Sequence, residues 1–214
     1  MQDTLYFSRN PNPRLGLAVA RYLGAPVSAV FASYSNPDQR AVLEPLNPNG
    51  LLPVLSKTDG PALWETDAIA CYLSRSIGSN FWRQDDDQPD MMRWIIWGHQ
   101  KFVAACDLVN WERATKPRYG IGPTDQAGVD QGLRDFRAFS AILSDALADR
   151  HFLLGETPSY ADFRMATFLP YLLENRLPID EFPILAAWND RLNAIPAWAD
   201  PFDGLDAPEL PRIP

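Results

Sequence analysis

The sequence predicts two domains, a small mixed α/β domain followed by a domain built only of helices. Short β-type runs alternate with helical periodicity up to about residue 77. The polar stretch RQDDDQPD at 83–90 then changes the composition sharply, and no convincing strand follows it. We therefore expect an N-terminal domain at 1–80, a linker at 81–88 and an all-helical domain at 89–214.

The first half of the N-terminal domain has the pattern strand, helix, strand, helix. Gly24 follows the first helical run, as expected of a residue that closes a helix. Two strands connected through a helix pair in parallel, so the first two strands should be neighbours in one sheet. The expected elements are a strand at 4–7, a helix at 13–23, a strand at 27–32 and a short irregular helix at 37–46.

The second half of this domain begins with a turn signal, Asn-Pro-Asn-Gly at 47–50. Two strand candidates follow at 53–56 and 62–64, and the Asp59-Gly60 pair between them indicates a hairpin. A helix is expected at 66–77. The hairpin should add an antiparallel edge to the parallel pair.

The second domain shows helical patterns only. Ser159 and Asp162 have the spacing of a capping box, in which the two residues exchange hydrogen bonds and fix the start of a helix. The proline-rich tail at 196–214 is expected to lie extended over the surface or to be loose. The expected helices span about 89–115, 124–149, 160–175 and 182–194.

Composition and charge exclude several classes of partner. The 214-residue chain carries a formal net charge of -8 and no basic stripe, which argues against nucleic acid or an anionic membrane surface. The N-terminus lacks a leader pattern, and no apolar run approaches the roughly 18 residues of a membrane span. A cytoplasmic location is the expectation.

Cysteine and histidine are scarce. The two cysteines, Cys71 and Cys106, both lie in helical patterns with apolar neighbours, so buried thiols are expected and not a disulfide framework. With two histidines and no CxxC or His-x-x-x-His spacing, we expect no metal site.

Three motifs occur in order along the chain. They are Asn47-Pro48-x-Gly50-x-Leu52-Pro53-Val54-Leu55, Leu63-x-Glu65-Thr66-x-Ala68-Ile69-x-x-Tyr72-Leu73 and Gly155-x-x-x-Ser159-x-Ala161-Asp162. Together these motifs resemble the cytosolic glutathione transferase family, and the order of elements agrees from end to end. The stretches Trp111-Glu112-Arg113 and Lys116-Pro117-Arg118-Tyr119-Gly120 resemble a version of the second domain associated with bacterial transferases. The resemblance implies a thioredoxin-like N-terminal domain and an all-helical C-terminal domain.

The resemblance implies that glutathione is the co-substrate and that four residues bind it. Leu52 and Pro53 would share a cis peptide bond, leaving the Leu52 backbone to pair with the cysteinyl part of the tripeptide. Glu65 and Thr66 stand where a strand ends and a helix begins, so free helix amides and the Thr66 hydroxyl would bind the γ-glutamyl carboxylate, and Glu65 its ammonium group. The alternatives are a core strand begun by proline and an ordinary helix cap at Thr66.

The loop at 8–13 is where the chain departs from the family. Relatives carry Tyr, Ser or Cys after the first strand to hold the glutathione thiolate. Counting back from Gly24 places Asn10 at that position, whereas counting forward from the strand places Ser8 there. Either side chain can donate a hydrogen bond to a thiolate, and neither is a general base. Turn chemistry explains the loop equally well, and Arg14 is read either as a ligand for the anion or as a solvated side chain.

The electrophile pocket is implied to involve the first long helix of the second domain, with Trp94, Trp97 and His99 as candidates. Core or dimer packing is the favoured role for the tryptophans. The function predicted is a homodimeric enzyme that conjugates glutathione to small hydrophobic electrophiles, as in detoxification, or reduces peroxides with it. The alternatives are a non-catalytic binding or interaction protein and a glutathione-dependent isomerase.

Overall fold

The computed structural model describes residues 2–213, and these divide into two compact units. The first unit contains the chain up to Trp82 together with Ile195–Leu210, and the second contains Arg83–Ala194 and the residues from Pro211 onward. The sequence-based division differs in one respect, because it assigned all of 89–214 to the helical domain. In the structure the segment Ile195–Leu210 belongs to the first unit.

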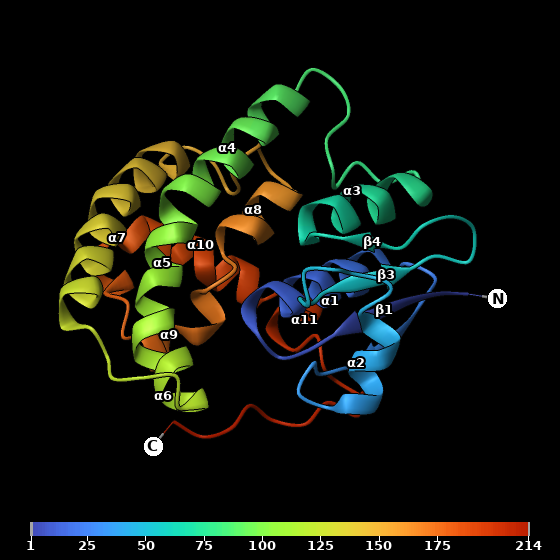
Figure 1. Cartoon of the computed structure of the whole chain (residues 1–214). Helices are drawn as coiled ribbons and strands as arrows, with labels where there is room; N and C mark the ends of the chain where they lie inside the picture. Colours follow the sequence, from blue (N-terminus) through green and yellow to red (C-terminus); the bar gives the residue numbers. More distant parts are fainter. Residues whose placement is uncertain (1, 214) are drawn as a thin grey trace. The chain divides into compact units, whose positions relative to one another are not determined.

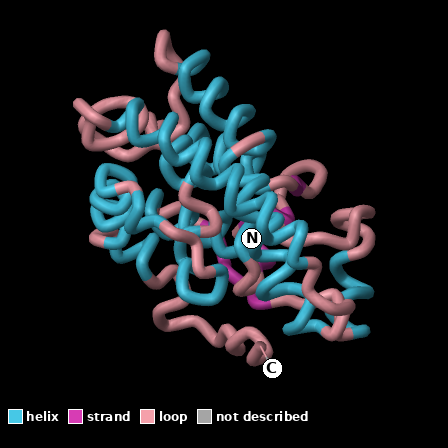
Figure 2. The backbone as a smooth tube through the Cα atoms, turned by 90° about the vertical axis from the view of Figure 1, so that its left-hand side faces the viewer, coloured by secondary structure: helices cyan, strands magenta, loops and turns pink. Residues whose placement is uncertain are grey.

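The first unit is built on a four-stranded mixed sheet in the order β2-β1-β3-β4. β1 (Asp3–Phe7) pairs in parallel with β2 (Val27–Phe31) and antiparallel with β3 (Val54–Ser56), and β3 pairs antiparallel with β4 (Leu63–Trp64). The predicted parallel pair and antiparallel hairpin are both confirmed. The magenta segments in Figure 2 show how little of the chain this sheet takes up.

The helices of this unit are α1 (Pro11–Leu23), α2 (Pro37–Leu43), α3 (Thr66–Ser76) and the short α11 (Pro196–Ala199). α1 begins at Pro11, earlier than the predicted start at residue 13. Asn10 is its N-cap, and Pro11 fits the first helical position, where no N–H is needed. At the other end Gly24 has φ 57°, a left-handed conformation that glycine adopts without a steric penalty.

The core of the first unit includes side chains from the late segment Ile195–Leu210. Inward-facing residues of the sheet pack with apolar residues of α1 and α3, and Phe202 and Ala207 complete the cluster. Trp198 is fully buried as well. The members from the sheet and its helices are Leu5, Phe7, Leu17, Ala20, Leu55, Ile69 and Leu73.

The expectation of an extended or loose tail is therefore wrong for residues 196–207. Figure 1 shows α11 beside α1. Two large aromatic residues, Trp198 and Phe202, could have indicated that this segment is buried. The residues that this segment contacts lie almost 200 positions earlier in the chain. Local patterns do not reveal pairing over that separation.

Among its described residues the second unit has helices and no strand, and Phe152 and Gly155 form an isolated β-bridge. The predicted helix at 89–115 is split, because Lys101 leaves helical geometry with φ -132° and ψ -94°. The predicted helix at 160–175 is likewise broken into three, and Pro170, which lacks an N–H, lies in the 3-10 turn between the two α-helical pieces. The elements are α4 (Gln88–Gln100), α5 (Phe102–Asn110), the π-helical η1 (Trp111–Thr115), α6 (Lys116–Tyr119), α7 (Gln126–Leu147), α8 (Tyr160–Met165), η2 (Leu169–Tyr171), α9 (Leu172–Asn175), η3 (Ile179–Glu181) and α10 (Pro183–Asn193).

The capping box predicted at the start of α8 is present. Asp162 is fully buried and its Oδ2 accepts hydrogen bonds of 2.9 Å from both the backbone N–H and the hydroxyl of Ser159. Its Oδ1 accepts from the Leu153 N–H at 2.8 Å and from Trp188 Nε1 at 3.1 Å. Burial raises the pKa of this carboxyl, and the four donors oppose the rise. Asp162 thus joins three segments of the helical unit.

Helices α5 and α7 approach each other closely at Gly132. A Cβ at this position would lie 2.6 Å from Val109 Cγ2 and 3.0 Å from the Ala105 carbonyl oxygen. The contact therefore leaves no room for any side chain. Within residues 2–213, no helix is both long enough and apolar enough to cross a membrane.

Candidate functional site

The predicted glutathione-binding segments converge on the first turns of α1. The Thr66 hydroxyl donates a hydrogen bond of 3.2 Å to the carbonyl oxygen of Asn12. One turn further along α1, a Cβ on Gly16 would lie 3.1 Å from Pro53 Cγ and 3.8 Å from Thr66 Cγ2. Three segments that are distant in sequence thus meet at the N-terminal end of one helix.

Leu52 and Pro53 lie just before β3. The peptide bond between them is cis, as the family resemblance implied. Pro53 is buried and Leu52 is half-buried. Because β3 begins at Val54, Leu52 lies outside the strand ladder, where a peptide ligand can approach its backbone.

Glu65 and Thr66 form the start of α3. Glu65 is the N-cap residue and has φ 69° and ψ 123°, a left-handed conformation that is strained for a residue with a Cβ. Its side chain is exposed and makes no capping bond. Thr66 is 2% exposed and occupies the first helical position, so it is not the cap that one sequence interpretation made it. Strain of this kind, of order 1–3 kcal/mol, is concentrated at functional sites.

The Thr66 hydroxyl already has an acceptor. Because its one proton is donated to Asn12, an anion at this point would meet the backbone N–H of Thr66, unless the hydroxyl rotated away. The amides in the first turn of a helix have no acceptor within the helix, and they attract carboxylates. The Thr66 side chain therefore joins the start of α3 to the first turn of α1.

Ser8 and Asn10, the two candidates for thiol activation, are in contact with each other. The backbone N–H and the Nδ2 of Asn10 donate to Ser8 Oγ over 3.4 and 3.3 Å. Because Ser8 Oγ is the acceptor in both bonds, the Ser8 hydroxyl keeps its own proton for another partner. Ser8 is 7% exposed and Asn10 is half-buried at the N-cap of α1. The two alternative candidates from the sequence, Ser8 and Asn10, are thus members of one hydrogen-bonded pair.

Arg14 is buried and not solvated. It is 5% exposed, it donates to the carbonyl oxygen of Trp198, and its guanidinium carbon lies 4.9 Å from the centre of a Trp198 ring. The interpretation of Arg14 as a solvated side chain is therefore corrected. The guanidinium holds α11 against α1, a role that no local pattern indicated.

Trp94 and Trp97 pack within the helical unit. The Trp94 ring meets the Trp97 ring edge-on at 5.5 Å, and Trp97 in turn meets Phe139 at 5.7 Å. Trp94 is 5% exposed, and its buried Nε1 has no partner among residues 2–213. A packing role is what the sequence favoured for both tryptophans.

His99 differs from the two tryptophans because its side chain is exposed. Its Nε2 lies 3.1 Å from Arg164 Nη2 and 3.3 Å from Arg164 Nε. A guanidinium can only donate, so His99 Nε2 is the acceptor in these contacts. The polar neighbour of His99 is thus a buried arginine of α8.

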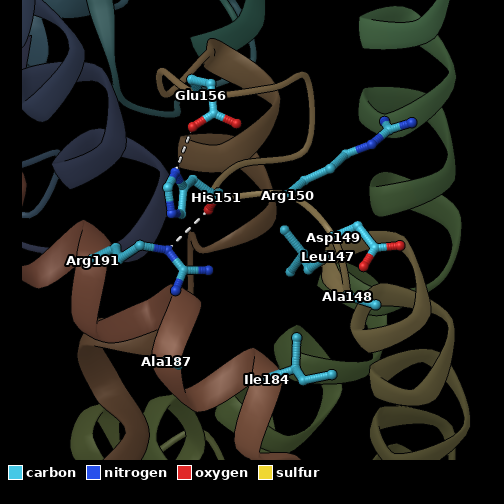
Figure 3. A pocket seen from close by; sticks show the side chains of 9 residues that line it. All are labelled: Leu147, Ala148, Asp149, Arg150, His151, Glu156, Ile184, Ala187 and Arg191. Carbon is cyan, nitrogen blue, oxygen red and sulfur yellow. Dashed lines mark hydrogen bonds and ion pairs between the residues drawn. The ribbon is translucent and has the colours of Figure 1, made fainter.

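Two hollows occur elsewhere. A cavity of about 320 Å³ in the helical unit has His151, bonded to Glu156 at 2.6 Å, on its wall, and Arg191 donates to the His151 carbonyl (Figure 3). None of the site residues predicted from the sequence lines it.

In the first unit a hollow of about 570 Å³ runs along α3 and β4, lined by Lys57, Leu63, Ala68, Cys71, Tyr72, Arg75 and Ser76. Burial raises the pKa of the Cys71 thiol in this hollow.

The two halves of the chain match two family models. Residues 12–76 match the glutathione S-transferase N-terminal domain, and residues 126–191 match the glutathione S-transferase C-terminal domain. The chain belongs to the glutathione S-transferase family. The first match contains Pro53, Glu65 and Thr66, whereas Ser8 and Asn10 lie just before it.

Individual relatives cover most of the chain. Glutathione S-transferase stcT of Emericella nidulans is 28% identical over 197 residues, which span 89% of this chain and 86% of that protein. Glutathione S-transferase 2 of Schizosaccharomyces pombe is 27% identical over 229 residues, 94% of this chain and 95% of that one. The structure of maize glutathione S-transferase I with an atrazine–glutathione conjugate has the same fold, with a TM-score of 0.82, 22% identity and coverage of 92% and 94%.

Proposed function

We propose that this glutathione transferase binds glutathione at the N-terminal end of α1 and transfers its sulfur to small hydrophobic electrophiles. The observation that carries the proposal is the convergence of the Pro53 loop, the start of α3 and the Ser8–Asn10 pair on one helix end. Solved relatives support the choice of ligand, since one from Pseudomonas fluorescens holds two glutathione molecules. Glutathione acts as a co-substrate in this scheme.

Each part of glutathione has a partner at this site. The backbone of Leu52 pairs with the cysteinyl unit, in the manner of an added strand. The first amide of α3, on Thr66, takes the γ-glutamyl carboxylate, and the exposed Glu65 carboxylate pairs with the ammonium group. The strained backbone of Glu65 fits such a binding role.

The thiol is activated by hydrogen bonding and by the helix end. Ser8 donates its free hydroxyl proton to the sulfur, while the two Asn10 N–H groups hold and polarise the Ser8 oxygen. The positive end of α1 favours the thiolate further. Together they lower a thiol pKa that is ordinarily about 8.5. The thiol proton leaves to solvent, the sulfur attacks an electrophilic carbon, and the leaving group departs with its electron pair.

The helical unit supplies the surface for the electrophile in this proposal. His99 is its most accessible candidate, because Trp94 is almost fully buried and Trp97 is half-buried. The two tryptophans would then shape the wall behind His99.

A second copy of the chain is the proposed occupant of the hollow along α3 and β4. β4 is an edge strand, Trp64 on it is 37% exposed, and the hollow between Leu63 and Tyr72 is largely apolar. Ala68→Glu should shift the protein from dimer to monomer in analytical ultracentrifugation, while Ser28→Glu on the opposite edge strand should not. Monomeric wild-type protein would reject the proposed dimer.

A cytoplasmic location is also proposed, and cell fractionation tests it.

Activity and binding are measured together to test the function. Wild-type protein incubated with glutathione and a chloronitrobenzene should form the thioether conjugate, and calorimetry should show glutathione binding. Binding without conjugation or peroxide reduction across a broad substrate panel would favour a non-catalytic binding protein. Product formation that returns glutathione unchanged would indicate an isomerase. Absence of binding would overturn the proposal, and Glu65 and Thr66 would then only start a helix.

A further inference from the structure

The loop between Ser8 and Asn10 is bonded to the C-terminal segment of the chain. Arg9, the residue between them, donates from Nε to the Ala207 carbonyl oxygen at 3.0 Å. Its Nη2 lies 2.9 Å from Glu209 Oε1, and its guanidinium carbon lies 4.2 Å from the centre of the Phe202 ring. One side chain thus makes three different contacts with the segment 200–209.

Two of the three partners of Arg9, Phe202 and Ala207, are held in the core, whereas the Glu209 side chain is exposed. Phe202 and Ala207 are each 9% exposed. The Phe202 ring lies 6.0 Å from the ring of Phe7, the residue directly before Ser8, and the Phe202 N–H donates to Asp200 Oδ1 at 3.0 Å. The segment is therefore a fixed support for Arg9 and not a mobile tail.

Two arginines of α1 bond this segment or the residues just before it. Arg14 bonds the carbonyl oxygens of Trp198 and Ala199, and Arg21 donates to the Asp203 carbonyl oxygen at 2.5 Å. Arg21 lies in the last turn of α1, far from the loop that carries Ser8. Arg9, Arg14 and Arg21 thus all bond residues 198–209, and Arg9 is the one of the three that lies between Ser8 and Asn10.

The bonds inside that loop are long. Asn10 reaches Ser8 Oγ over 3.3 and 3.4 Å, at the upper end of the range for hydrogen bonds. Such bonds fix a side chain weakly, although a hydrogen-bond donor must be placed accurately to stabilise a charge. A displacement of about 1 Å can lower a catalytic rate about a hundredfold. The loop therefore needs support from outside.

We propose that Arg9 is a positioning residue for thiol activation, and that the segment 200–209 is a strap that fixes the Ser8–Asn10 pair through it. This inference rests on the proposed function. The strap acts on the sulfur end of the site and not on Leu52 or Thr66. Loss of the strap should therefore impair thiolate formation more than glutathione binding.

The test compares Arg9→Met with Arg21→Met in the full-length chain. Methionine keeps an apolar stem of similar length but removes the guanidinium. Arg9→Met should lower kcat about tenfold, shift the ascending, acid-side limb of the pH–rate profile to higher pH by about one unit and leave the KM for glutathione within about twofold. Arg21→Met should match the wild type in all three. Arg9→Lys, which keeps the charge, should fall between the two.

Phe202→Leu tests whether the strap is the partner that matters. It keeps apolar volume in the core but removes the ring under the guanidinium, so it should shift the pH–rate profile in the same direction as Arg9→Met. The proposal is overturned if Arg9→Met leaves the pH–rate profile unchanged, if Arg21→Met shifts it equally, or if Phe202→Leu has no effect on it. A wild-type chain that forms no conjugate would instead overturn the proposed function. The two failures are therefore distinguished by the activity of the wild-type protein.

Discussion

Thr66 is the side chain that connects the two halves of the proposed glutathione site. Its hydroxyl bonds the carbonyl oxygen of Asn12, and its methyl group approaches Gly16. The same residue presents the first amide of α3 to a ligand. A single buried threonine thus ties the start of α3, the proposed carboxylate site, to the first turn of α1, which directly follows Ser8 and Asn10.

Replacement of this hydroxyl should weaken both the fold and ligand binding. Thr66→Val keeps the shape but leaves the Asn12 carbonyl without its donor, which should lower the free energy of unfolding by about 1 kcal/mol. The affinity for glutathione should fall by roughly the same free energy, about fivefold. Thr66→Ser keeps the hydroxyl and serves as the control. Denaturant unfolding and calorimetric titration measure the two effects, and equal behaviour of the valine and serine variants would contradict this role.

At the scale of elements, glycine sets how closely α5 and α7 pack. Gly132→Ala would place a Cβ 2.6 Å from Val109 Cγ2 and 3.0 Å from a backbone oxygen. The helices must separate, at an expected cost of about 1–3 kcal/mol. Gly128→Ala in the same helix meets its nearest atom at 3.4 Å and should be neutral or stabilising by up to about 1 kcal/mol. Thermal unfolding of both variants tests the prediction, which fails if Gly132→Ala is as stable as Gly128→Ala.

The capping box of α8 acts on the same scale. Asp162→Ala removes the acceptor for four donors, from Leu153, from Trp188 and two from Ser159. Buried donors without acceptors should make the variant about 3–5 kcal/mol less stable. Asp162→Asn retains one oxygen and should be clearly more stable than the alanine variant in denaturant titrations. The inferred role of Asp162 would be contradicted if its removal left the unfolding midpoint unchanged.

Elements with local signals could be predicted from the sequence. The sheet strands, α1, α3 and the capping box all follow from periodicity, turn residues or a four-residue spacing. The break at Lys101 has no such signal, because nothing in its side chain prevents a helix. At the site, the sequence indicated Leu52, Pro53, Glu65 and Thr66. It could not decide between Ser8 and Asn10, since only the three-dimensional structure shows that the two are bonded to each other.

At the scale of the whole molecule, the chain returns to its first unit after completing the second. The segment Ile195–Leu210 packs with the N-terminal sheet and α1. These contacts join buried aromatics and arginines to backbone carbonyls nearly 200 residues away, so they could not be predicted from local sequence. The stability of the first unit therefore depends on the late segment Ile195–Leu210.

Trp198→Ala tests this dependence. The side chain is fully buried and packed on Arg14, so its loss should lower the free energy of unfolding by about 3–5 kcal/mol. Hydrogen exchange should accelerate in β1, β2 and β3, which belong to the same unit. Exposed Trp111, in the helical unit, offers a control, since Trp111→Ala should leave exchange in the sheet unchanged. Unaltered exchange in the sheet of the Trp198 variant would contradict the dependence.

A crystal structure with glutathione bound is the most direct test of the proposed site. The sulfur should lie within about 3.2–3.5 Å of Ser8 Oγ or Asn10 Nδ2, with the γ-glutamyl carboxylate at the Thr66 amide and the cysteinyl backbone paired with Leu52. Glutathione bound elsewhere, or a sulfur in contact with neither Ser8 nor Asn10, would contradict the account.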